Sequence, residues 1–240
     1  MGKINKVVWL EDGNVFVVRK GKTSNKKITD GKELVQTYTF SMEQYTLANH
    51  HKGFGMKKFF ALDGSNCLDC PFSGNQGKGG CYTHKFNQYV GFLSMLRSIK
   101  PSELTEFSPE KHTQCLFMAM NTYVRFGTYG EPSLLDQNLV SNMADVASSY
   151  TGYTHQWKKD WAKPYGSWFM ASTHSQFQSD VAKQLGYRSF VATKGGQYAD
   201  TDAVMCPASN EANFKSNCAS CGLCSGIKGK GTKDVKILIH

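Results

Sequence analysis

Cysteines in two groups are the residues of this 240-residue chain best suited to chemistry. Cys67, Cys70 and Cys81 lie in a glycine-rich polar loop, which is a poor environment for cysteines of a hydrophobic core. The Cys-x2-Cys pair suits a metal, because a tight turn can aim two sulfurs at one centre while backbone N–H groups point at the thiolates. Three ligands are one short of a closed tetrahedral site. Either a fourth comes from elsewhere or one position is left open for chemistry.

The second group lies near the C-terminus and consists of Cys206, Cys218, Cys221 and Cys224. The run Cys-x2-Cys-x2-Cys resembles the ligand run of bacterial ferredoxins, which wraps one iron–sulfur cluster. Four thiolates also make a closed structural zinc site, so zinc is the competing metal. The spacing around Gly222 favours iron–sulfur over paired zinc knuckles. Cys206 could instead complete the first site, and the sequence leaves this partition open.

Composition limits the remaining possibilities. The chain is 40% hydrophobic, enough for a full core, and Cys115 in an apolar run is expected inside it. No apolar run approaches the roughly 20 residues of a membrane span, and the N-terminus lacks the apolar core of a signal peptide. We therefore expect a cytoplasmic protein without a membrane partner. Because the cytosol keeps thiols reduced, eight cysteines in that compartment indicate metal binding rather than disulfides.

The net charge of +9 includes lysine runs at 20–27 and 228–236. Such a field attracts phosphate-bearing partners, but no aromatic-plus-basic motif accompanies it, so nucleic-acid binding is only weakly supported. Gly21-Lys22-Thr23 is not a phosphate loop, because Phe16 stands where that motif needs glycine. The substrate is unknown, and the chain is expected to be a monomer or small oligomer.

The N-terminal region, residues 1–56, is predicted to be a β-hairpin cover. Two β-rich runs within 7–19 flank Asp12-Gly13, the strongest hairpin signal in the chain, and 35–40 is expected to add a third strand.

From residue 57 onward, short apolar runs alternate with helical patterns, which predicts a parallel α/β fold. In such folds the carboxyl ends of the strands share one face, which carries the site. The first cysteine loop, the 127–131 turn, His155, Ser172, Thr173 and Cys206 all lie at such ends. Strands are expected at 59–62, 123–126, 152–157, 168–172, 187–193, 203–205 and 235–239, and helices at 85–99, 139–150 and 177–185.

A strand, a three-cysteine loop, a helix and a strand ending in Tyr129-Gly130-Glu131-Pro132 resemble the opening of a radical S-adenosylmethionine enzyme. The resemblance implies a partial (β/α) barrel of about six parallel strands over 57–205, followed by a cysteine-rich segment, 206–240. It implies that the three loop cysteines hold a [4Fe–4S] cluster, and that Tyr129, Gly130 and Glu131 contact the amino group of S-adenosylmethionine. The loop spacing is C-x2-C-x10-C, whereas the superfamily uses C-x3-C-x2-C.

The phrases RFGTYGEP, TGYTHQW and CPAS also resemble a family of uncharacterised phage and bacterial proteins related to radical-SAM-like proteins. This resemblance implies a viral origin and action in a host cytoplasm.

Three hypotheses follow. The leading one is a two-cluster iron–sulfur protein on a radical-SAM-like partial barrel, as a radical enzyme with His155 and Tyr153 as candidate proton or substrate contacts. The second keeps both clusters in a redox or structural protein without turnover. The third is a zinc-stabilised module that binds nucleic acid.

Overall fold

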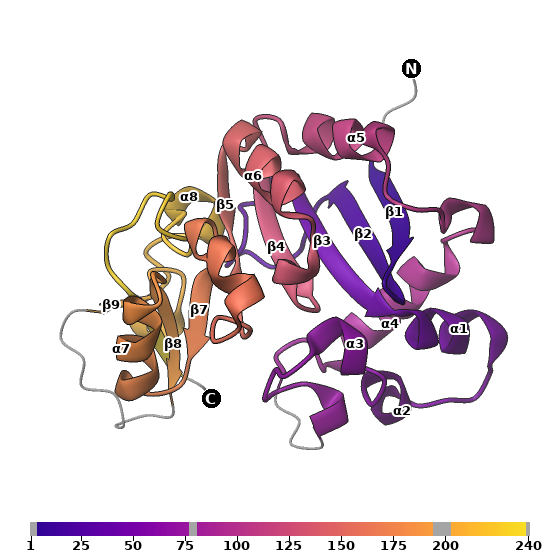
Figure 1. The fold of residues 1–240 in the computed structure, drawn as a ribbon, viewed down its shortest axis with the longest axis horizontal. Coiled ribbons are helices and arrows are strands. Elements are labelled where there is room, and N and C mark those ends of the chain that lie inside the picture. The colour runs from indigo at the N-terminus through magenta and orange to yellow at the C-terminus, as the bar shows by residue number, and fades with distance from the viewer. Residues whose placement is uncertain (1–3, 77–80, 194–202, 239–240) are drawn as a thin grey trace.

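The computed structural model describes residues 4–76, 81–193 and 203–238 of the chain, which form a mixed α/β fold (Figure 1). Two five-stranded sheets have the orders β1-β2-β3-β4-β5 and β6-β7-β8-β10-β9. The strands are β1 (Lys6–Glu11), β2 (Asn14–Gly21), β3 (Leu34–Ser41), β4 (Tyr123–Tyr129), β5 (Ser149–Thr151), β6 (Tyr153–Thr154), β7 (Met170–Thr173), β8 (Ser189–Thr193), β9 (Val204–Met205) and β10 (Val235–Leu238). The α-helices are α1 (Met42–His50), α2 (Met56–Phe60), α3 (Gly64–Cys67), α4 (Phe86–Arg97), α5 (Pro109–Ala119), α6 (Gln137–Val146), α7 (Gln176–Gln184) and α8 (Cys218–Cys221). Short 3-10 helices are η1 (Gly74–Gln76), η2 (Pro101–Glu103), η3 (Pro132–Leu134), η4 (Asp160–Ser167) and η5 (Asn210–Ala212).

The predicted N-terminal hairpin is confirmed. Strands β1 and β2 pair antiparallel with Glu11 opposite Asn14, and Asp12 and Gly13 between them both have positive φ, as a tight hairpin turn requires. The third predicted strand is β3, which pairs antiparallel with β2. On its other side β3 pairs in parallel with β4, so the hairpin shares one sheet with the strands that follow it.

The predicted α/β class with parallel strands is confirmed as well. Every pairing from β3 onward is parallel: β3 with β4, β4 with β5, β6 with β7, β7 with β8, and β10 with both β8 and β9. Gly152 separates β5 from β6. Its carbonyl accepts a hydrogen bond from the Met170 N–H, so the chain passes at this residue from the edge of one sheet to the edge of the other.

The strand predicted at 59–62 is wrong, because Phe59 and Phe60 belong to helix α2. Both phenylalanines are buried in the cluster formed with α1 and α4, whereas a half-buried strand would alternate inside and outside residues. A short apolar run does not distinguish a strand from a turn of buried helix. The strand that precedes the first cysteine loop is therefore β3, and α1 and α2 lie between them.

The first sheet is covered on both faces. Phe16 and Val18 of β2 pack with α5 and α6 on one face, whereas Val15 and Val17 pack with α1 and α4 on the other. In the second sheet, α7 packs on one face and the C-terminal cysteine segment on the opposite face. Figure 1 shows α8 beside one end of β5 and α3 near the opposite end of β3 and β4.

The other predicted elements are confirmed with shifted ends. The helices predicted at 85–99, 139–150 and 177–185 are α4, α6 and α7, and the later strands correspond to β4, β6, β7, β8, β9 and β10. The last residue of the predicted strand 235–239 lies outside the described residues. Cys115 is fully buried in the core, as expected. Among the helices of the described residues, none has the length and apolar character needed to cross a bilayer.

Candidate metal centres

The first cysteine loop brings Cys67, Cys70 and Cys81 into one neighbourhood. Burial raises the pKa of Cys67, and the negative charges of Asp63 and of the other two thiols, when ionised, raise it further. Burial also raises the pKa of Cys70 to about 12, against the opposing effect of hydrogen bonds from the backbone of the residues that follow it. The three thiols are therefore protonated near neutral pH, and metal binding would have to displace their protons.

Three of the predicted ligands, Cys70, Cys81 and Cys206, accept hydrogen bonds at sulfur from backbone N–H groups of the turns that follow them. Phe72 and Ser73 contribute such backbone hydrogen bonds to Cys70, Thr83 contributes one to Cys81, and Ala208 contributes one to Cys206. The Thr83 hydroxyl also lies 3.0 Å from Cys81 Sγ. Hydrogen bonds of this kind stabilise thiolates bound to metal clusters and tune their potentials.

The carboxylate of Asp63 connects the two ends of this loop through hydrogen bonds. It is fully buried and accepts a hydrogen bond from Gln44 Nε2 at 2.8 Å and from the Gly74 N–H at 3.2 Å. The Tyr129 hydroxyl donates to the same carboxylate, and His84 Nε2 lies 3.1 Å from it. Because these partners precede, interrupt and follow the cysteine loop, Asp63 fixes where Cys67 and Cys81 lie relative to each other. Nothing in the sequence pattern singled out this residue.

The turn at the carboxyl end of β4 docks directly on the first loop. The Glu131 N–H donates to the Asn66 carbonyl at 2.7 Å, one residue before Cys67. Gly130 has φ +77°, and a Cβ there would lie 2.5 Å from the Thr39 carbonyl oxygen and 3.1 Å from that of Asn66. Only glycine allows so close an approach of three backbone segments. The predicted convergence of this turn with the cysteine loop is therefore seen in the geometry.

Gly130→Ala should destabilise the protein by about 1–3 kcal/mol, because the added methyl group meets backbone that cannot move independently. Gly31→Ala is the matched control: Gly31 has φ +70°, but a Cβ added there would meet no neighbouring atom within 4 Å. The control variant therefore measures the cost of a positive φ at alanine without any steric clash. Urea denaturation of both variants measures the difference, and equal losses of stability would mean that the close approach to Thr39 and Asn66 contributes nothing.

The side chains of the predicted cofactor-binding residues are already engaged. The Tyr129 hydroxyl points into the core, where it contacts Asp63 and Gln44. The Glu131 carboxylate accepts from the Ser133 N–H at 3.1 Å, the Ser133 hydroxyl at 2.7 Å and the His155 N–H at 3.1 Å. Burial raises the pKa of Glu131, and these hydrogen bonds oppose that effect. The turn can therefore offer a cofactor only main-chain groups.

The second cysteine group contains all four C-terminal thiols, including Cys206. Burial is the largest cause of the raised pKa of Cys224, and the negative charges of Cys206, Cys218 and Cys221, when ionised, raise that pKa further. Burial raises the pKa of Cys218 to about 11. These mutual charge effects group Cys206 with the C-terminal run, a partition that the sequence had left open.

Hydrogen bonds to residues 27–28 and 149–152 position the segment that carries this second group. The N–H groups of Cys218 and Ala219 donate to the carbonyls of Lys27 and Ile28, and the Cys224 carbonyl accepts from the Gly152 N–H. The Ser149 hydroxyl donates to the Ala219 carbonyl at 2.8 Å. The second group consequently lies at the amino end of β4, whereas the first lies at its carboxyl end.

A half-buried arginine contacts the first loop and acts on a thiol of the second group. Arg125, in the middle of β4, donates from Nη2 to the Tyr82 hydroxyl at 2.7 Å, and its guanidinium carbon lies 5.5 Å from the centre of the Tyr82 ring. Tyr82 follows Cys81 directly. Burial raises the pKa of Cys218, and the positive charge of Arg125 opposes that effect. None of the ion pairs found among the described residues involves Arg125. The positive charge thus acts on Cys218 of the second group, and a hydrogen bond joins it to the residue that follows Cys81 of the first.

Tyr153 and His155 lie in different surroundings, although both were candidates for one site. Tyr153 packs on Phe190 with ring centres 4.3 Å apart, and it contacts the second cysteine group through Cys224. His155 faces the first loop, where its ring lies 6.0 Å from that of Phe72. His174, which no sequence pattern singled out, lies beside it with ring centres 5.8 Å apart.

The donor chemistry fits two metal centres, but the side chains are not closed around a metal. Within residues 4–76, 81–193 and 203–238, no three His, Cys, Asp or Glu side chains are arranged to hold a single ion. Two sets of reduced thiols with N–H···S turns fit iron–sulfur clusters, whose ligands surround several metal atoms and so stand further apart than those of one ion. Binding would draw the side chains in, as is usual when metal binding and local folding are coupled.

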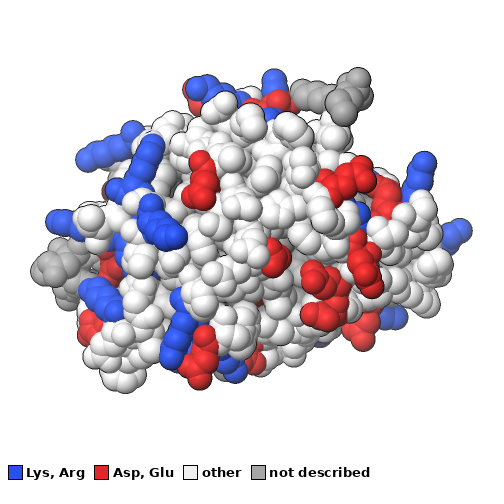
Figure 2. Space-filling view, turned by 45° about the horizontal axis from the view of Figure 1, so that its top comes forward, with Lys and Arg blue, Asp and Glu red and all other residues white. Residues whose placement is uncertain are grey.

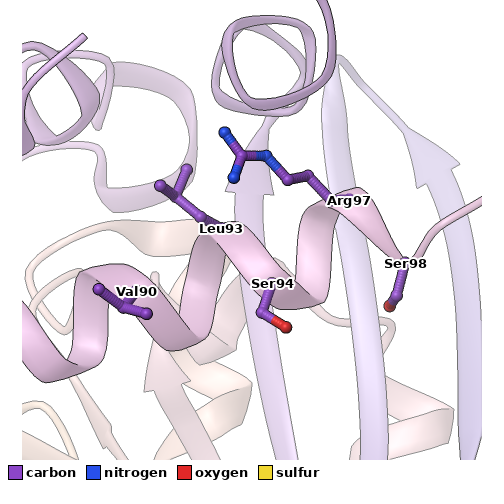
Figure 3. Close-up of a pocket in the computed structure, with 5 residues that line it drawn as sticks. All are labelled: Val90, Leu93, Ser94, Arg97 and Ser98. Carbon is purple, nitrogen blue, oxygen red and sulfur yellow. The ribbon is translucent and has the colours of Figure 1, made fainter. Parts of the chain in front are cut away.

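Two grooves at the surface lack this chemistry. A groove of about 580 Å³ follows the outer side of α4 and is lined by Val90, Leu93, Ser94, Arg97 and Ser98 (Figure 3). Its walls hold neither a thiol nor an imidazole. A second groove, of about 270 Å³, borders the start of β5 and the loop after α8.

Charge is unevenly distributed over the molecule. Figure 2 shows lysine and arginine side chains gathered over the half that carries α7, α8 and the second sheet, while acidic side chains gather over the other half. On this face the acidic groups interrupt the positive field that a net charge of +9 produces.

No model of a protein family matches the chain, and neither does any curated protein or any solved structure.

Proposed function

We propose that the protein is an iron–sulfur protein with two clusters, each of the [4Fe–4S] type. The observation that carries the proposal is the grouping of seven free thiols into two sets, at the two ends of β4. Cys67, Cys70 and Cys81 would hold the first cluster. Cys206, Cys218, Cys221 and Cys224 would hold the second, which would then have a complete set of thiolate ligands.

Electron transfer between the two centres is the role that this arrangement supports best. The charge of Arg125 acts on Cys218 of the second group, and its guanidinium is hydrogen-bonded to Tyr82, the residue after Cys81 of the first group. A cluster with thiolate ligands carries net negative charge, so the half-buried guanidinium would stabilise it, most of all in its reduced form. In this role Arg125 sets potentials and Tyr82 holds the guanidinium in place.

Arg125→Leu should shift the reduction potential of the nearer cluster to more negative values by roughly 40–90 mV. The figure corresponds to about 1–2 kcal/mol for one charge near the cluster at an effective dielectric constant of about 20. Arg125→Lys keeps the charge and should keep most of the potential. Arg19→Leu removes an exposed arginine of β2 and serves as the control. Redox titration followed by EPR measures the shift, and identical potentials in the Leu variant and the parent would refute this role.

A radical S-adenosylmethionine enzyme on a partial (β/α) barrel is the second candidate. It is supported by the succession of parallel strands β3, β4, β5–β6, β7, β8 and β10, and by the docking of the Gly130 turn beside Cys67. A cluster with S-adenosylmethionine bound supplies radical chemistry. Here Gly130 would bring main-chain groups to the cofactor, and Phe72 with His155 would exclude water from it.

A zinc-stabilised module that binds nucleic acid is the remaining alternative, and the positive half of the surface in Figure 2 favours it. Anaerobic purification separates it from the iron–sulfur proteins at once. A brown protein with broad absorption near about 400 nm, containing iron and sulfide, supports the clusters; a colourless protein that contains zinc refutes them. Incubating the reduced protein with S-adenosylmethionine then tests the enzyme, which requires formation of 5′-deoxyadenosine.

A further inference from the structure

Two imidazoles lie at the carboxyl ends of neighbouring strands, close to the first cysteine loop. His155 follows β6 and His174 follows β7, and these strands pair in parallel. Both imidazoles lie nearly perpendicular to the ring of Phe72, two residues after Cys70, at centre distances of 6.0 Å for His155 and 4.9 Å for His174. The pair therefore borders the loop whose three thiols leave one coordination position without a ligand.

The hydrogen bonding of His174 fixes its tautomer. Nδ1 lies 3.2 Å from the carbonyl oxygen of Ala192 in β8. A carbonyl oxygen only accepts, so Nδ1 must carry the proton. Burial lowers the pKa of His174, which keeps the ring neutral. In the neutral ring with Nδ1 protonated, Nε2 carries a free lone pair.

That lone pair has no partner in the part of the chain that the structure describes. Nε2 of His174 is buried without a hydrogen bond, and so is Nε2 of His155. A buried polar atom without a partner destabilises the fold, so a functional reason for keeping it is expected. A ring that donates from one nitrogen to a backbone carbonyl and leaves the other free is the arrangement of a histidine ready to bind a metal.

The connection to the first group is made through the chain as well as through Phe72. The His155 N–H donates to Glu131. The Glu131 N–H in turn donates to the Asn66 carbonyl at 2.7 Å, one residue before Cys67. The strand ends that carry the imidazoles, the Gly130 turn and the cysteine loop thus form one contiguous region. Of the two imidazoles, only His174 has a hydrogen bond that fixes which nitrogen is free.

We infer that His174 is the fourth protein ligand of the first metal centre, bound through Nε2 and completing a Cys3His set with Cys67, Cys70 and Cys81. This inference rests on the proposed function, and it favours electron transfer over the radical enzyme, because the imidazole would fill the position that S-adenosylmethionine needs. A neutral imidazole in place of a thiolate also raises the potential of a cluster. The first centre would then be the electron acceptor and the second, with four thiolates, the donor.

Pulsed EPR tests the inference on the full-length chain. The protein is reconstituted anaerobically with ferrous iron and sulfide, reduced with dithionite and examined for a ¹⁴N nucleus coupled strongly to the cluster. The Cys221→Ser variant, which should retain only the first centre, removes overlapping signals. Labelling with ¹⁵N-histidine assigns any coupling to an imidazole without a further substitution, so the test does not depend on a histidine variant that folds.

The expected result is a histidine coupling that persists in His155→Gln and is lost in His174→Gln, while iron is still bound. His174→Cys should retain the cluster and lower its potential, since a thiolate replaces a neutral ligand. A cluster without histidine coupling, or with a coupling that survives in His174→Gln, overturns the inference and leaves the proposed function standing. A chain that takes up neither iron nor sulfide refutes the proposed function and the inference together.

Discussion

Replacing Asp63 with alanine should remove the first metal centre and lower stability by about 3–5 kcal/mol. Gln44, Tyr129 and His84 would each lose a buried partner, as would the Gly74 N–H, and the loop would lose the contact that holds its two ends together. Iron should fall to about half of the parent value, because the second group does not depend on Asp63. Metal analysis and urea denaturation measure the two effects.

Asp234→Ala is the matched control for this experiment. Asp234 is also buried, and it accepts hydrogen bonds from Ser179 and from the Ser189 N–H in the second sheet. Its loss should destabilise the protein to a similar extent without selective loss of the first centre. If Asp63→Ala binds as much iron as the parent, Asp63 does not organise the cysteine loop.

Cys221→Ser should release the second metal and loosen residues 203–234. Apart from the two-residue strand β9, this stretch has only the short helices η5 and α8, and turns and backbone hydrogen bonds to neighbouring segments hold the rest of it. Metal ligation is expected to supply much of its folding energy. We expect amide exchange in α8 to accelerate by about 100-fold or more, which corresponds to about 2.7 kcal/mol. Hydrogen exchange followed by mass spectrometry gives this value directly.

Cys115→Ala distinguishes loss of a ligand from loss of a cysteine. Cys115 is fully buried in the core between the first sheet and α5, and burial raises its pKa to about 12. Its replacement should lower stability as a small cavity does, with iron content unchanged.

For Cys221→Ser, amide exchange in α8 at the rate of the parent protein would show that residues 203–234 fold without a metal.

The sequence predicted the parts of the fold that local signals determine. Asp12-Gly13 specified its hairpin because few residue pairs suit a turn with two positive φ values. The apolar runs of β4, β7 and β8 were long enough, and well enough bounded by turns, to be found. The run at 59–62 was too short for its period to show, and its two phenylalanines are buried on a helix instead.

For the two candidate metal centres, the sequence could predict the types of ligand and their spacing, but not the contacts between distant parts of the chain. Cysteine spacing identified the thiols, but the partner of Cys206 depends on how β9 and β10 pair, which is a long-range property. The contacts of Asp63 reach residues 11 to 66 positions away, and that of Arg125 with Tyr82 spans 43 positions, so no local sequence pattern identifies either residue. A charged residue within the apolar run of β4 was the available signal for Arg125. His174 follows the predicted strand 168–172, but only Ser172 and Thr173 were taken from that strand end, and His174 is the next residue.

Counting metals in the anaerobically purified protein tests the two-centre account most directly. The account predicts about eight iron atoms and about eight sulfides per chain, from two [4Fe–4S] clusters. It predicts about four of each when Cys67, Cys70 and Cys81 are replaced together by alanine, and about four when Cys221 alone is replaced by serine. A metal-free chain, a zinc-only chain, or iron that stays the same in both variants would contradict it.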